Sequence, residues 1–267
     1  MSDIYHIDIQ DSIGQCEDIF MSLVDRYYNS AGAADASRLE AEKDDAKDKI
    51  RNLCRAVEHR IELLLYVKDM INDFDWSKYH RFEYYREESK KTSGEGVVCQ
   101  VLQDGKILIK FKHKESMENF VFINLMTFFS GIASIVDNIA LILRYSFNLK
   151  IPPDRLTNIW RVQKELPESS LKKHLHDNII ADKIFTGVLA VRKDCEHRDR
   201  SQVFIWSDSI RSEGIGSRVS NIPLIRRDLV DIDETARREI SNYCEMAYSK
   251  LYNFLKSFFS LVLTTSL

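Results

Sequence analysis

Residues 120–143 read FVFINLMTFFSGIASIVDNIALIL and form the longest apolar run of the chain. It is almost continuously apolar over a length that matches a bilayer, but Asn124, Asp137 and Asn138 interrupt it. The rest of the chain is rich in charge, as is typical of a soluble protein. The pattern therefore favours a buried central helix, which we expect from Met117 to Phe147, over a membrane span.

The composition excludes several structural classes. The chain has 267 residues, of which 44% are hydrophobic and 30% charged, with only 9 glycines and 4 prolines. So few turn-forming residues exclude an all-β fold with many turns, and the hydrophobic fraction is too high for a disordered chain. We therefore expect a mainly α protein, an antiparallel helical bundle with an N-terminal helical extension and a small β-hairpin.

Charge, cysteine content and the N-terminus indicate an intracellular protein. The net charge is -3, so no overall basic field draws the chain to nucleic acid or anionic lipid, and such binding needs a local patch. The five cysteines contain no C-x-x-C pair, which favours free thiols in a reducing compartment over a metal site. No signal peptide is visible, and we expect a cytoplasmic protein without metal, cofactor or stable membrane association.

Helices are predicted for most of the N-terminal region, residues 1–114. A short amphipathic helix is expected from Glu17 to Asn29. A long helix begins at Ser37, where Glu40 completes a capping box, and runs to about Phe74. The N-terminal region is therefore expected to be a helical extension of the main domain.

A β-hairpin is predicted near residues 97–112. Two runs, residues 97–102 and 106–112, flank Asp104 and Gly105, a dipeptide that suits a tight primed turn. Lysines occupy one face of the second run, which favours a solvated edge strand over a platform for nucleic acid.

Residues 115–267 are expected to form a helical domain. After the apolar helix, a second helix from Ser170 to Arg198 places apolar residues three to five positions apart and is expected to pack antiparallel on the first. An irregular insertion with five arginines follows at residues 199–232. A last helix begins near Asp233 and ends near Leu263.

The end of the second predicted helix carries the candidate site. Residues 190–200 read AVRKDCEHRDR, in which Arg192 is followed after four residues by His197. This arrangement resembles the R-x(4-6)-H signature of the HEPN superfamily, small helical domains of which many are metal-independent endoribonucleases. Residues 129–140, with Asp137 inside an apolar run, also look like the first helix of that superfamily. The resemblance covers about residues 117–263.

The resemblance implies a HEPN-like helical bundle and a function. It implies a homodimer in which two Arg-His pairs meet in a cleft, with RNA or a nucleotide as ligand and no cofactor. In this superfamily, endoribonuclease activity is often part of a defence system or is the activity of a toxin. The chain departs from the family in two places, because many members carry Asn, Asp or His where this chain has Lys193, and a long insertion follows His197 here.

Elementary chemistry explains why such a pair suits RNA cleavage without a metal. The RNA 2′-hydroxyl can attack the adjacent phosphorus, a histidine near neutral pKa can transfer the proton, and a guanidinium can hold the phosphoryl oxygens. We expect His197 to be the general acid or base and Arg192 to hold the phosphate. The expected supporting residues, which orient the pair or bind RNA, are Asp137, Lys193, Arg198 and Arg200.

Helix geometry leaves two arrangements of the pair open. Five residues advance an α-helix by about 140° beyond a full turn, so Arg192 and His197 do not share one face of a straight helix. Either the helix unwinds near His197, or a second chain completes the site across a twofold axis. The family resemblance implies the second arrangement.

Other interpretations remain. Arg192 with Glu196, and Asp194 with Arg198, are spaced i, i+4, which is also typical of a solvated helix end stabilised by salt bridges. The chain would then be a non-catalytic helical module that binds a nucleotide or a protein. A membrane-associated helical protein is a third interpretation, which rests only on the apolar stretch.

Two further pairs of residues that include histidine are expected to be solvated. Arg55 and His59 share a helix face at i, i+4, but this spacing is shorter than that of the signature. His174 and His176 are two residues apart, which points them in different directions on a helix and makes them poor partners for one metal.

Overall fold

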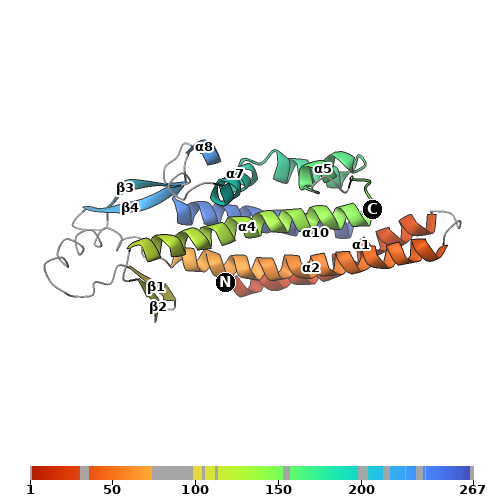
Figure 1. Cartoon of the computed structure of the whole chain (residues 1–267), viewed down its shortest axis with the longest axis horizontal. Helices are drawn as coiled ribbons and strands as arrows, with labels where there is room; N and C mark the ends of the chain where they lie inside the picture. The colour runs from red at the N-terminus through yellow and green to blue at the C-terminus, as the bar shows by residue number, and fades with distance from the viewer. Residues whose placement is uncertain are drawn as a thin grey trace. The chain divides into compact units, whose positions relative to one another are not determined.

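The chain folds mainly into α-helices, which confirms the predicted class (Figure 1). The computed structural model describes residues 2–30, 36–73, 99–103, 106–111, 114–152, 157–197, 204–212, 217–225, 227–232, 237 and 239–264. The long helices are α1 (Ser2–Ser30), α2 (Ala36–Asn72), α4 (Lys114–Ser146) and α10 (Ile240–Thr264). The shorter helices are α5 (Ile159–Glu165), α6 (Ser170–Leu175), the π-helix η3 (His176–Ile180), α7 (Lys183–His197) and α8 (Arg227–Val230).

Contacts within the chain divide it into two compact units. The first unit consists of Met1–Leu63, Gly131–Thr186 and Ser249–Leu267, and the second consists of Leu64–Ser130 and Gly187–Tyr248. The boundaries fall within α2, α4, α7 and α10. These boundaries differ from the boundary near residue 114 that the sequence predicts. The contact-based units do not test that division, which stays a prediction.

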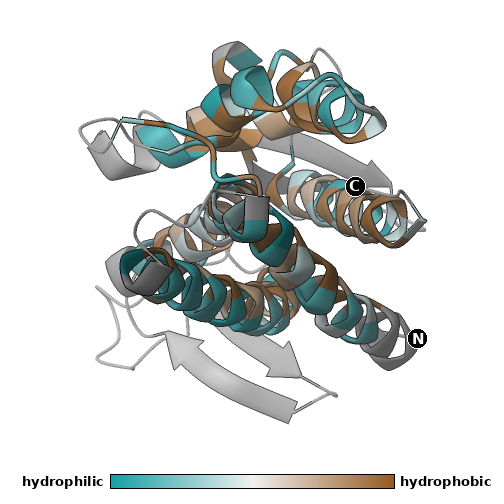
Figure 2. Cartoon of the chain, turned by 90° about the vertical axis from the view of Figure 1, so that its right-hand side faces the viewer, coloured by the Kyte–Doolittle hydropathy of each residue, from teal (hydrophilic) through white to brown (hydrophobic). Residues whose placement is uncertain are grey.

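Helix α1 is longer than predicted, because the expected start at Glu17 is wrong. In the first unit Phe20 of α1 stacks on Phe258 of α10, with ring centroids 6.5 Å apart. The apolar stripe begins well before Glu17, and burying it stabilises the earlier turns. Figure 2 shows helices that are hydrophobic on one side and hydrophilic on the other. The buried residues of α1 follow one face at helical spacing: Ile9, Ile13, Cys16, Phe20 and Val24.

Helices α2 and α4 confirm the two long helices expected from the sequence. Within the described residues, α4 is the helix that is long and apolar enough to cross a membrane, and 61% of its most apolar window is buried inside the protein. Phe128, Ile132 and Ile139 are completely buried. This burial agrees with the interpretation of α4 as a core helix.

The first hairpin has the predicted position. Strands β1 (Cys99–Gln103) and β2 (Lys106–Phe111) pair in antiparallel fashion. The register joins Cys99 to Phe111 and Gln103 to Lys106, with an irregularity between Val101 and Leu102. The dipeptide at 104–105 lies outside the described residues.

The expectation of an irregular insertion at residues 199–232 is wrong. Strands β3 (Phe204–Ser212) and β4 (Ser217–Ile225) form a second antiparallel pair, and α8 follows. Only short apolar runs are visible in the sequence here, because the strands continue through polar residues such as Asp208 and Asn221, which face each other in the register. The hydrogen bonds between two strands join backbone groups and do not require apolar side chains. The pattern of hydrophobic residues therefore does not show how long the strands are.

The helix expected from Ser170 to Arg198 is interrupted. It consists of α6, the π-helix η3 and α7, with a break at Ala181 and Asp182. Helix α5 was not predicted; Asn158 caps it by accepting a hydrogen bond from the backbone N–H of Arg161 at 3.0 Å. The expected antiparallel pairing of residues 170–198 with the apolar helix stays a prediction. Helix α10 begins at Ile240, and the expected cap at position 233 lies outside the described residues.

Candidate functional site

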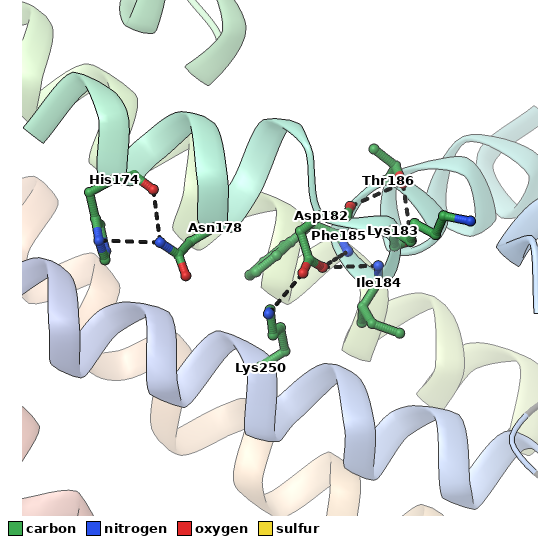
Figure 3. A network of polar contacts seen from close by, with 8 residues as sticks. All are labelled: His174, Asn178, Asp182, Lys183, Ile184, Phe185, Thr186 and Lys250. Carbon is green, nitrogen blue, oxygen red and sulfur yellow. Dashed lines mark hydrogen bonds and ion pairs between the residues drawn. The ribbon is translucent and has the colours of Figure 1, made fainter.

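Helix α7, which carries the Arg-His pair, is fixed at its N-terminus by Asp182. The Asp182 Oδ1 atom accepts hydrogen bonds from the backbone N–H groups of Ile184 at 2.9 Å and Phe185 at 3.1 Å. Its Oδ2 atom lies 2.8 Å from the Nζ atom of Lys250 on α10 (Figure 3). A carboxylate here satisfies N–H groups that have no partner within the helix and complements the helix dipole. α7 therefore starts as a new helix that is joined to α10.

In the second unit, α7 packs closely on its neighbours. A Cβ atom at Gly187 would lie 2.4 Å from the Oη atom of Tyr243 on α10 and 3.3 Å from Val230 at the end of α8. Tyr243 also contacts Phe129 of α4, with ring centroids 6.0 Å apart. The absence of a side chain at Gly187 therefore lets α7 approach α10 and α8.

The structure places three of the predicted site residues near the end of α7. Arg192 is partly buried and follows Val191, which is completely buried, whereas Lys193 is exposed. His197 is the last residue of α7, and its side chain lies outside the described part of the structure. Because α7 is helical as far as His197, the two positions of the pair are about 140° apart around its axis. α7 therefore does not bring Arg192 and His197 onto one face.

The remaining predicted site residues are Asp137, Arg198 and Arg200. Asp137 is partly exposed on α4 and belongs to the first unit, whereas Arg192 belongs to the second. Arg198 and Arg200 lie outside the described residues. The expected roles of these three residues stay predictions.

His174 is not the solvated residue that the sequence predicted. It is half-buried, and its ring stacks on Phe254 of α10 with centroids 5.8 Å apart and planes 16° apart. Its Nδ1 atom lies 3.2 Å from Asn178 Nδ2, and its Nε2 atom lies 3.2 Å from Ser257 Oγ. Burial lowers the pKa of His174 below its ordinary value, although a hydrogen bond to the backbone of Phe254 and the charge of nearby Asp177 act in the opposite direction. One signal of this environment is present in the sequence, because His174 and Asn178 are four residues apart and therefore lie on the same face of a helix.

The second Arg-His pair is solvated, as predicted. Arg55 and His59 are both exposed on α2, and the His59 Nδ1 atom lies 3.7 Å from a carboxylate oxygen of Glu62. Such an exposed contact contributes little to stability. This pair therefore provides a matched control for experiments on Arg192 and His197.

The described cysteines have the features of core residues. Cys16, Cys54 and Cys244 are free thiols and are buried. Burial raises the pKa of Cys16 and of Cys54 to about 12, so both are held in the unreactive thiol form. No group of three or more His, Cys, Asp or Glu side chains within the described ranges is placed to hold a metal ion.

Comparisons with protein families, curated proteins and solved structures gave no match to this chain. The candidate site therefore rests on its own residues and on the resemblance of its motif.

Proposed function

We propose that the chain is a dimeric, metal-independent endoribonuclease of HEPN type, with a role in defence or as a toxin. The observation that supports the proposal is that α7 is well anchored and remains helical as far as the Arg-His pair. This helix is capped by Asp182, packed through Gly187, and continues to His197 with Arg192 in its last turns. The mainly α fold is consistent with a helical domain of this superfamily.

In the proposed reaction, the RNA 2′-oxygen attacks the adjacent phosphorus and the bond from phosphorus to the 5′-oxygen breaks. The products are a 2′,3′-cyclic phosphate and a 5′-hydroxyl. His197 takes the proton from the 2′-hydroxyl or gives one to the leaving 5′-oxygen, and Arg192 holds the charged phosphoryl oxygens. Lys193, which is exposed beside Arg192, adds positive charge for the RNA backbone.

A second copy of the chain is part of this proposal. The two residues lie about 140° apart on α7, so one phosphate cannot contact both on a straight helix. A twofold axis that pairs two α7 ends would place Arg192 of one copy near His197 of the other.

The test is cleavage of a labelled structured RNA by the purified protein in EDTA. We expect wild-type protein to cleave, and we expect His197→Ala to lose about 10²- to 10⁴-fold in rate, the usual contribution of a general acid or base. Arg192→Ala is expected to lose activity as well, and the products of the wild type should carry cyclic phosphate ends.

The exposed pair on α2 supplies the control. His59→Ala and Arg55→Ala change the same residue types at solvated positions and should cleave like wild type. All variants are compared at matched oligomeric state, measured by light scattering. Equal cleavage by His197→Ala and wild type would refute the proposal, and RNA binding without cleavage by every protein would favour the non-catalytic binding module instead.

A further inference from the structure

The segment before α7 contains an uncommon element in contact with α10. Helix α6 continues as the π-helix η3, and the backbone N–H of Ala181 closes this segment by donating to the carbonyl oxygen of His176 at 2.9 Å. π-helical turns are rare and occur frequently at functional sites. In this segment His174 contacts Ser257 and Phe254 of α10, and Figure 3 shows the hydrogen bonds between His174 and Asn178.

The hydrogen bonds around His174 determine its protonation state. Asn178 Nδ2 lies 3.0 Å from the carbonyl oxygen of His174 and 3.2 Å from its ring Nδ1 atom. A carbonyl oxygen only accepts hydrogen bonds, so the atom that faces it must be the amide nitrogen of Asn178. The second hydrogen of that amide then points to Nδ1, which accepts it and therefore carries no proton.

The other ring nitrogen carries the proton. The Nε2–H group donates to Ser257 Oγ at 3.2 Å, and the hydroxyl of Ser257 donates to the carbonyl oxygen of Asn253 at 2.8 Å. Every polar atom of the ring is thus satisfied in the neutral form. The same assignment excludes a catalytic pair in which Ser257 is the nucleophile and His174 is its base. To take the proton of Ser257, His174 would need an unprotonated Nε2 atom.

Few charged groups act on this ring. On α10 it faces Ser257 and Phe254, which do not titrate, and Lys250 is paired with Asp182. Helix α5 contacts α6 through Lys172, which donates to the carbonyl oxygens of Lys164 and Leu166. Within four positions of His174 or Phe254 along the chain, the other ionisable residues are Lys172, Lys173, His176, Asp177, Lys250, Tyr252 and Lys256. Among the described charges, Asp177 is the one that affects the pKa of His174.

We propose that His174 is a pH-sensitive clamp, which holds the α6–η3 segment on α10 while its ring is neutral and releases the segment when the ring is protonated. A proton on Nδ1 would set two donors, the ring N–H and the amide of Asn178, against each other. Rotation of the amide restores that contact only by breaking its bond to the carbonyl oxygen of His174. The stack on Phe254 and the hydrogen bond to the Phe254 backbone favour the protonated ring and oppose the release. Neither of them replaces the lost contact with the amide of Asn178.

The direction of the pH effect follows from burial. The folded protein holds the pKa of His174 below its value of 6.5 in an unfolded chain, so the unfolded state binds the proton more readily. The clamp therefore contributes its full stability above about pH 6.5, and this contribution is lost as the pH falls through the pKa of the folded state.

The experiment is an NMR titration of the histidine rings of the full chain, with the His174 signal assigned by its absence in His174→Gln. We expect the His174 ring to titrate below 6.5 and Asn178→Ala to raise its pKa, because that variant removes the opposing donor. The exposed neighbour gives the control, since His176→Gln should leave the titration of His174 unchanged. A ring that titrates at or above 6.5 in wild type, or at the same pH in Asn178→Ala, overturns the proposal.

Hydrogen exchange measures the release itself. After correction for intrinsic exchange, backbone amides of residues 174–180 should lose protection between pH 7.5 and pH 5 in wild type. Amides in the centre of α1 should keep theirs, because α1 has no such clamp. Equal protection of residues 174–180 at both pH values would show that protonation does not open the segment.

Discussion

At the scale of the residue, two glycines in helices have opposite roles. Gly187 in α7 has no space for a side chain, because a Cβ atom would lie 2.4 Å from Tyr243 Oη and Tyr243 is completely buried. Gly14 in α1 has no heavy atom within 4 Å of its Cβ position. Gly187 is therefore required by packing, whereas Gly14 only lowers the helix propensity of α1.

The same substitution at these two positions should change stability in opposite directions. Gly187→Ala should lower the free energy of unfolding by about 1–3 kcal/mol, as overpacking of a core does. Gly14→Ala should raise it by about 1 kcal/mol, the difference in helix propensity between glycine and alanine. Denaturant unfolding monitored by circular dichroism measures both. A Gly187→Ala protein as stable as wild type would contradict the close approach of α7 to α10.

At the scale of the element, Asp182 determines where α7 begins. Its carboxylate both caps α7 and pairs with Lys250, and its side chain is only 14% exposed. We expect Asp182→Ala to lose about 1–2 kcal/mol of unfolding free energy, the usual contribution of an N-cap. Asp182→Asn keeps an oxygen acceptor and should lose less.

Lys250 allows the cap to be separated from the ion pair. Its side chain is 38% exposed, so Lys250→Ala should cost no more than about 1 kcal/mol. Chemical denaturation of the three variants gives the order of their losses. If Lys250→Ala proved as destabilising as Asp182→Ala, the ion pair and not the cap would be the main contribution of Asp182.

At the scale of the whole molecule, the proposed active site needs two chains. If Arg192 and His197 of different copies form each site, mixing Arg192→Ala with His197→Ala protein creates dimers with one intact site. Random exchange of subunits should then restore about a quarter of the wild-type cleavage rate, since half of the dimers carry one of two sites. The RNA assay in EDTA, performed before and after mixing, measures this recovery. No recovery despite proven subunit exchange would place both residues of a site in one chain.

Much of the fold could be predicted because the signals are local. The apolar run that became α4, the helical spacing of apolar residues along α2 and the two runs that became β1 and β2 are each readable over a few neighbouring residues. The break at Asp182 was missed, because the apolar spacing continues across it and hides the N-cap signal of Asp182. Strands β3 and β4 were missed because their ladder joins polar residues.

The helical class, the long helices α2 and α4, the first hairpin and the spacing of Arg192 and His197 can be read from the chain alone, since all depend on periodicity or on neighbouring residues. The surroundings of His174 and Gly187 depend on the folded structure. Their partners, Ser257 and Tyr243, lie on α10, far away along the chain. A half-buried histidine and a glycine without space for a side chain are defined by contacts between distant residues, and such contacts leave no periodic signal in the sequence.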